Sequence, residues 1–227
     1  MNKTALDQYE EIVTDALKNC SAKLRKSFKT AFIQLMILYM VLPRKINFTQ
    51  MGRYSDSSEQ RFRQLFEREF DWMQFNLLLM RQQFGESVRK AIAIDASYIS
   101  KSGKKTPYIG KFWSGCASRV KRGLEILGIG IIDIDSRDCM MLRAEQTPDK
   151  AYLEKRGEDY NLVDWYLDVL RKYKDSLLGI TRYVVADAWF SKAKFVGEAC
   201  LLGFHVISRL RDDAALWYSH DGVRIGK

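Results

Sequence analysis

The feature that most constrains the fold is a change of hydrophobic pattern near residue 90. Residues 1 to about 88 repeat apolar side chains at helical intervals and carry almost no strand signal. From Ala91 onward, apolar and β-branched runs alternate with helical stretches and turns. The pattern therefore predicts a helical region at 1–89, followed by a mixed α/β domain at 90–227.

Within the second region, the order of elements narrows the topology. We expect strands at 91–99, 124–134 and 139–146, with a basic segment before the second strand and a turn at 135–138. A helical region at about 149–176, a strand at 182–188, a helix at 191–202 and a strand at 204–210 follow. Three antiparallel strands and then helix, strand, helix, strand predict one mixed sheet with crossover connections.

The first region contains a helix with a recognisable start. Ser57 and Gln60 have the spacing of a capping box, which predicts that a helix begins there. The side chains expected on its buried face are Phe62, Leu65, Phe66 and Phe70. Its arginines point outward in this prediction, so contact between that outer face and DNA is compatible with it.

Charge is distributed unevenly. The chain has 37 Lys and Arg against 28 Asp and Glu, a formal charge of +9. The segment from Lys101 to Leu124 holds seven basic residues and no acidic one, and Lys18 to Lys29 holds five basic residues without an acid between them. Such runs favour a polyanionic partner, although a solvated surface is the alternative for each.

Composition also limits the setting of the protein. The most apolar run, "AFIQLMILYMVLP", is closed by Pro43 after about a dozen residues, too few to cross a bilayer, and is predicted to be a core helix. The four cysteines form no CxxC pair, so we expect buried, reduced thiols and no zinc site. The N-terminus has no export signal, which favours a cytoplasmic protein.

Two aspartates stand in apolar, strand-like runs. Asp95 lies in "AIAIDASYIS" and Asp187 in "VVADAWFSK". Capping of the following helix is the structural alternative for Asp187, but Ser191 stands closer to that helix and is able to cap it. Asp95 has no helix close behind it. A buried, unpaired carboxylate is costly, so two of them on strands that can lie side by side indicate a shared cation.

Carboxylate oxygens suit Mg²⁺ or Mn²⁺, and two such ions about 4 Å apart stabilise the attacking and leaving oxygens of a phosphoryl displacement. The basic segment begins six residues after Asp95, where it would hold a phosphate backbone near the ions. Metal-dependent phosphodiester chemistry is therefore the leading hypothesis.

The motifs "AIDASYISKSGKK", "FWSGCASRVKRGLEILGIGIIDID", "QTPD", "VVADAWFSK" and "FHVISRLRDDAALWY" resemble DDE transposases of bacterial insertion sequences. The resemblance spans most of residues 90–218. It implies an RNase H-like core, cut-and-paste DNA movement and two Mg²⁺ (or Mn²⁺) ions. It matches Asp95 to the first aspartate of the family and Asp187 to the second.

One departure from the family pattern is important. The catalytic glutamate of this family lies on a later helix within a Tyr, Arg, Glu, Lys motif, and the sequence reaches Lys227 before any such segment. We therefore expect an incomplete core, and activity of the 227-residue chain alone stays in question. Glu198, on the helix after Asp187, is a weak substitute because nothing around it resembles that motif.

The resemblance and the charge pattern together give the expected partners. These are double-stranded DNA at element ends and target, and a second copy of the chain on DNA, with no membrane and no small-molecule cofactor. The predicted phosphate contacts from the basic segment are Lys101, Lys104, Lys105, Arg119, Lys121 and Arg122. Arg209 and Arg211 are added by resemblance alone. Trp113 and Trp189 are expected in the core.

Two other functions stay open. In "IIDIDSRD", Asp133 and Asp135 stand two apart after an apolar strand, as in haloacid dehalogenase-like phosphatases, although a hairpin turn explains them better. Alternatively, the chain is a DNA-binding remnant of a transposase that occupies element ends without cutting.

Overall fold

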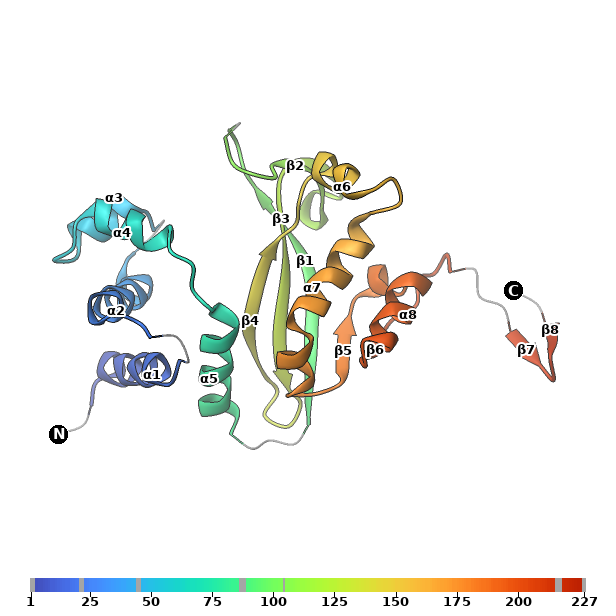
Figure 1. Ribbon diagram of the computed structural model, residues 1–227, viewed down its shortest axis with the longest axis horizontal. Coiled ribbons are helices and arrows are strands. Elements are labelled where there is room, and N and C mark those ends of the chain that lie inside the picture. Colours follow the sequence, from blue (N-terminus) through green and yellow to red (C-terminus); the bar gives the residue numbers. More distant parts are fainter. Residues whose placement is uncertain are drawn as a thin grey trace. The chain divides into compact units, whose positions relative to one another are not determined.

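A computed structural model describes residues 3–20, 23–43, 46–85, 89–103, 105–214 and 218–225. The chain forms two compact units, residues 1–86 and 87–227, which we call the helical unit and the sheet unit (Figure 1). In the part of the chain so described, no helix is both long enough and apolar enough to cross a membrane.

The described residues of the helical unit form five helices. They are α1 (Ala5–Asn19), α2 (Lys26–Val41), α3 (Phe48–Arg53), α4 (Glu59–Phe66) and α5 (Trp72–Phe84). Polar side chains start four of them by accepting backbone N–H bonds, and at α1 Thr4 and Asp7 form a full capping box. The cap of α4 is Ser58, one residue later than predicted from sequence, because Ser57 instead donates to Gln34 Oε1 at 2.7 Å.

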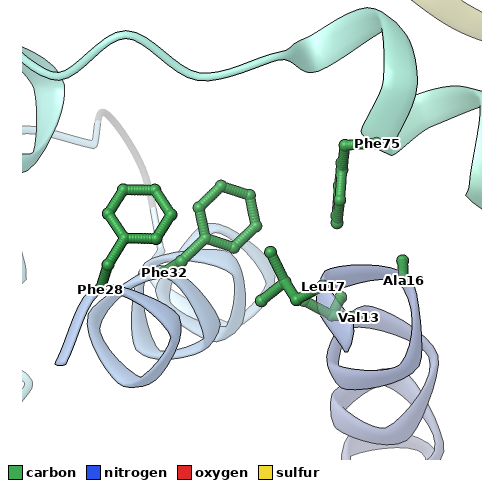
Figure 2. Packing of buried hydrophobic residues seen from close by; sticks show 6 residues of the cluster. All are labelled: Val13, Ala16, Leu17, Phe28, Phe32 and Phe75. Carbon is green, nitrogen blue, oxygen red and sulfur yellow. The ribbon is translucent and has the colours of Figure 1, made fainter. Parts of the chain in front are cut away.

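Aromatic side chains dominate the core of the helical unit. Figure 2 shows Val13, Ala16 and Leu17 of α1 facing Phe28 and Phe32 of α2 and Phe75 of α5. A second cluster joins α2, α3 and α4 around Leu35, Leu38, Met51 and Phe62. The apolar run around α2 is thus a core helix, as its length predicts. The prediction for the buried face of α4 is partly wrong, because the helix ends at Phe66 and the Phe66 side chain is exposed.

The sheet unit is built on one mixed sheet. Its strands are β1 (Lys90–Ser100), β2 (Gly110–Ser114), β3 (Arg119–Asp133), β4 (Asp138–Gln146), β5 (Tyr183–Ala186) and β6 (His205–Ser208). Hydrogen bonding gives the order β2-β3-β1-β5-β6, and β4 also pairs with β3. β1 is antiparallel to β3 and parallel to β5, which is parallel to β6. The predicted α/β class with an RNase H-like core after a helical region is confirmed.

Helices connect and cover this sheet. α6 (Lys150–Arg156) and α7 (Leu162–Leu178) link β4 to β5, and α8 (Ala193–Leu201) links β5 to β6. Figure 1 shows α7 along the sheet with α8 beside it. α7 buries Val163, Tyr166, Leu167 and Leu170, the three-and-four spacing that places side chains on one helical face. A short hairpin of β7 (Tyr218–His220) and β8 (Val223–Ile225) follows.

Four details differ from the sequence prediction. Strand β2 lies inside the predicted basic segment, and β3 starts at Arg119 rather than near 124. The helical region expected at about 149–176 consists of two helices, because Gly157 has φ 147°, outside helical space, and Asn161 starts a new capping box. The cysteines are free, but Cys116, Cys139 and Cys200 are exposed rather than buried.

Candidate active site

The parallel pairing of β1 with β5 brings the two predicted aspartates together. Ile94 of β1 is in register with Ala186, the last residue of β5. Asp95 and Asp187 are the next residues along these neighbouring strands, so both stand where the β1–β5 pairing ends. Below them, Ile92, Ile94 and Val184 are buried and fix the register. Asp187 thus follows the carboxyl end of β5, the usual place for a site in such sheets, and Asp95 lies on the neighbouring strand β1, which continues to Ser100.

Asp187 is held in position by the backbone that follows it. Its Oδ1 accepts the N–H of Trp189 at 3.0 Å, which caps a short 3₁₀ helix at Ala188–Phe190. The sequence argument that Ser191 caps the next helix is wrong, since Ser191 Oγ donates to Ala188 O at 2.8 Å. Asp187 therefore caps a helical turn and also presents a carboxylate at the strand end.

The two carboxylates interact electrostatically. Loss of water around Asp95 raises the pKa of its carboxyl, and the negative charge of Asp187 raises it further. Hydrogen bonds from Ala96 N–H and the Ser97 side chain act in the opposite direction. Both aspartates are nevertheless exposed residues, which corrects the expectation that their apolar runs bury them. A cation placed between them would relieve the repulsion.

Asp95 and Asp187 lie on the wall of one cleft of about 440 Å³. Side chains from β1, β2, β3, α7 and the turn after β5 surround it. The lining residues are Asp95, Ala96, Lys111, Phe112, Trp113, Glu125, Leu162, Tyr166, Asp187, Trp189 and Phe190. Its volume is within the range of ordinary ligand clefts.

A third acid, not predicted from the sequence, lies in this cleft. Glu125 is only 7% exposed, and the Tyr166 hydroxyl donates to its Oε1 at 2.6 Å. Burial and the charge of Glu125 hold the pKa of Tyr166 far above its ordinary value, so this hydroxyl stays a donor. The sequence pattern could have indicated this burial. Glu125, Leu127 and Ile129 alternate along β3, so they share one face of the strand, and Leu127 and Ile129 are buried.

The tryptophans of the cleft differ from each other. Trp113, predicted in the core, is 60% exposed, because it lies on the outward face of the short strand β2. Trp189 is half-buried and packs edge-on against Tyr166 and Phe190. The Lys192 ammonium lies 3.4 Å from the centroid of the Trp189 ring. Only Trp189 therefore has the packing role expected for both.

The residues predicted to contact DNA do not line the cleft of Asp95 and Asp187. Arg119, Lys121 and Arg122 lie on β3, where Lys121 is half-buried and both arginines are exposed. Lys101 and Lys105 are exposed between β1 and β2, and Lys104 is outside the described residues. Lys111, a basic residue that the prediction of contacts omitted, lines the cleft itself.

Arg209 and Arg211 follow strand β6 and are paired with acids. Arg209 lies 3.6 Å from Asp212, and Arg211 makes two hydrogen bonds to the Asp213 carboxylate, at 2.8 and 2.6 Å. These arginines can still contact a phosphate, but their positive charge is partly neutralised in this conformation.

The donor set fits one divalent cation. Mg²⁺ is commonly held by one or two carboxylates, with substrate phosphate and water in the remaining positions. Asp95 and Asp187 supply such a pair. Among the described residues, no group of three His, Cys, Asp or Glu is placed to share one ion. Glu198 does not line the cleft, and its carboxylate lies 4.0 Å from Arg171.

Asp133 and Asp135 do not form a phosphatase site. Asp133 is buried, and its Oδ1 accepts the N–H groups of Asp135 and Ser136, at 2.9 and 3.1 Å. Arg89 forms an ion pair with Asp135. These bonds order the turn between β3 and β4, so the hairpin interpretation is supported.

A family model described as DDE superfamily endonuclease matches residues 25–225, which include both aspartates and the whole mixed sheet. A search of curated proteins found no similar sequence.

Proposed function

Because the chain belongs to the DDE superfamily endonucleases, we propose that it is a DNA transposase that cleaves phosphodiester bonds and transfers DNA strands with the help of a divalent metal. The observation that supports the proposal is the position of Asp95 and Asp187, each directly after the last paired residues of the parallel strands β1 and β5, on one cleft wall. The family implies DNA as substrate. The proposal adds element ends and target DNA, and a homodimer that assembles on them.

The two aspartates have the same role in this proposal. They act as ligands for Mg²⁺ or Mn²⁺, with Asp187 oriented by the Trp189 N–H and Asp95 by hydrogen bonds from Ala96 and Ser97. The cation, when bound, stabilises negative charge on the phosphodiester as the bond breaks. Neither aspartate needs to transfer a proton.

The remaining side chains bind and place the DNA. Lys111 lines the cleft beside the acidic pair, where its ammonium attracts the phosphate next to the reacting bond. Lys101, Lys105, Arg119, Lys121 and Arg122 supply further phosphate contacts outside it. The Glu125–Tyr166 hydrogen bond ties β3 to α7 and keeps the cleft wall in place.

The test is cleavage of labelled duplexes taken from the DNA that flanks the coding sequence, with Mg²⁺ or Mn²⁺ and with EDTA. Asp95→Asn and Asp187→Asn should each reduce cleavage about 100-fold or more, since each removes several kcal/mol of metal-dependent stabilisation. Asp138→Asn, an exposed aspartate on β4 away from the cleft, is the matched control. Cleavage that survives Asp95→Asn would refute the proposed site.

Metal binding has a separate readout. Mn²⁺ should raise the unfolding temperature of the wild-type chain, because the cation binds the folded pair of carboxylates and not the unfolded chain. The same ion should leave Asp95→Asn unchanged while it still stabilises Asp138→Asn. If Mn²⁺ raises the unfolding temperature of the wild type and of both variants equally, the cation does not bind at Asp95.

A second candidate function is DNA binding without cleavage. It is favoured by the finding that no three-residue acidic or histidine cluster exists within the described ranges. This candidate predicts salt-sensitive DNA binding that persists in Asp95→Ala and Asp187→Ala, with no strand cleavage in any divalent metal. Robust, metal-dependent cleavage by the chain alone excludes it.

A further inference from the structure

Strands β2 and β3 form a two-stranded ribbon with two different faces. Their antiparallel register pairs Lys111 with Arg122 and Trp113 with Val120. Directly paired residues, and residues two apart on one strand, share a face of the ribbon. Lys111, Trp113, Val120 and Arg122 therefore make one face, which we call the ribbon face. The opposite face carries Phe112 and Ser114, both buried.

The ribbon face leaves two apolar side chains exposed to water. Trp113 is 60% and Val120 is 56% exposed. Trp113 is the most exposed of the four tryptophans whose side chains are described. Exposed apolar side chains that lie together on a strand commonly mark an interaction surface. Because Trp113 also lines the cleft of Asp95 and Asp187, whatever covers it lies beside the two carboxylates.

Charge selects the kind of partner. On the ribbon face, the pair of Lys111 and Arg122 lies next to the pair of Trp113 and Val120, and the sequence from Lys101 to Leu124 contains no acidic residue. The Arg122 guanidinium donates to Gly103 O at 2.9 Å, which holds this cation on the ribbon while it stays exposed. An aromatic side chain beside two cations matches a nucleic-acid strand, which offers both phosphates and π-faces.

We propose that Trp113 stacks on an unpaired base of the DNA strand whose phosphodiester lies at Asp95 and Asp187. The inference rests on the proposed function and adds a substrate-contacting residue and a DNA form to it. Inside a duplex, neighbouring bases cover each other's faces, so an indole next to the reacting bond can stack only on a base that is unpaired. The preferred substrate is thus DNA that is single-stranded next to the reacting bond.

The experiment measures binding of the full chain without divalent metal, so that no cleavage occurs. Two labelled DNAs of the same duplex sequence are compared, one blunt and one with a short single-stranded overhang. Trp113→Ala should weaken binding of the overhang DNA by about 5- to 150-fold, the range for loss of one stacked base. Binding of the blunt duplex should change less than about twofold. Trp113→Phe keeps an aromatic face and should bind nearly as wild type.

Tryptophan fluorescence supplies an independent readout. The overhang DNA should quench wild-type emission, and Trp113→Phe should lose that part of the quenching. Trp72→Phe, a change at another partly exposed tryptophan in the helical unit, should keep it. Unfolding temperatures of the variants identify any that fail to fold. If Trp113→Ala fails to fold, the test is the loss of quenching in Trp113→Phe.

The outcomes separate this inference from the proposed function. The stacking role is overturned if Trp113→Ala binds the overhang DNA as tightly as the wild type and no quenching depends on Trp113. The proposed function is unaffected by that result. An equal loss on blunt and overhang DNA also overturns it, since the residue would then contact duplex. Failure of the wild-type chain to bind either DNA overturns both.

Discussion

The hydrogen bond between Tyr166 and Glu125 permits a quantitative prediction. Tyr166→Phe removes only the hydroxyl that donates to Glu125 Oε1 at 2.6 Å. Both side chains are buried, at 1% and 7% exposure, so water cannot easily replace the lost donor. The ring itself stays and keeps its contacts with Trp189 and Phe190.

The expected cost follows from this geometry. A hydrogen bond to a charged group contributes about 1.5–3 kcal/mol, and a buried carboxylate left without its donor adds a desolvation penalty. We expect Tyr166→Phe to lower the free energy of unfolding by about 2–3 kcal/mol, measured by urea titration with circular dichroism at neutral pH. Adding Glu125→Gln should recover part of the loss, because a neutral amide costs less to bury.

Tyr160→Phe is the matched control. Its hydroxyl also donates to a carboxylate, Asp168 Oδ2 at 2.7 Å, but Asp168 is only half-buried and is paired with Arg156 and Arg171. The loss there should be below about 1 kcal/mol. The reasoning is refuted if Tyr166→Phe costs no more than Tyr160→Phe, or if Glu125→Gln deepens the loss.

Three further predictions concern other parts of the sheet unit. Burial alone would raise the pKa of Glu145, but hydrogen bonds from α7 hold that pKa below its usual value. The stability that this lowered pKa gives is present above the unfolded pKa and is lost as the pH falls. In a plot of unfolding temperature against pH, Glu145→Gln should therefore make the fall at acid pH less steep. Asp213→Asn should free Arg211 from its ion pair and let it contact a phosphate. The slope of log affinity against log salt concentration should then become steeper by about one released ion, measured from DNA affinity at several salt concentrations. Gly123→Ala would place a Cβ 2.4 Å from a carbonyl oxygen of β1 and should cost about 1–3 kcal/mol by urea titration, whereas Gly115→Ala, with open space around it, should be nearly neutral.

Much of the sheet and its acidic pair could be predicted from sequence, because they depend on local patterns. The apolar runs around Asp95 and Asp187 are long and β-rich, and the order of elements allows few topologies. Parallel pairing then places the two residues side by side, as the structure has them. The turn at Asp135 follows in the same way from residues that favour turns.

The missed features depend on tertiary contacts or on very short elements. β2 has five residues and begins within a run rich in lysine and glycine, so it carries little strand pattern of its own. Trp113 is apolar, and only its position on the outer face of that strand makes it exposed. Glu125 is charged, and its burial depends on a hydroxyl from Tyr166, which is 41 residues away in the sequence.

The parallel pairing of β1 with β5 also has a consequence for how the protein folds. It joins segments about 90 residues apart in the chain, and such distant contacts form late because the entropy of closing the loop must first be overcome. The hairpin of β3 and β4, by contrast, can form from neighbouring residues. During synthesis, the two acids therefore meet only after β5 has been made, and a nascent chain that ends before Tyr183 has no assembled site.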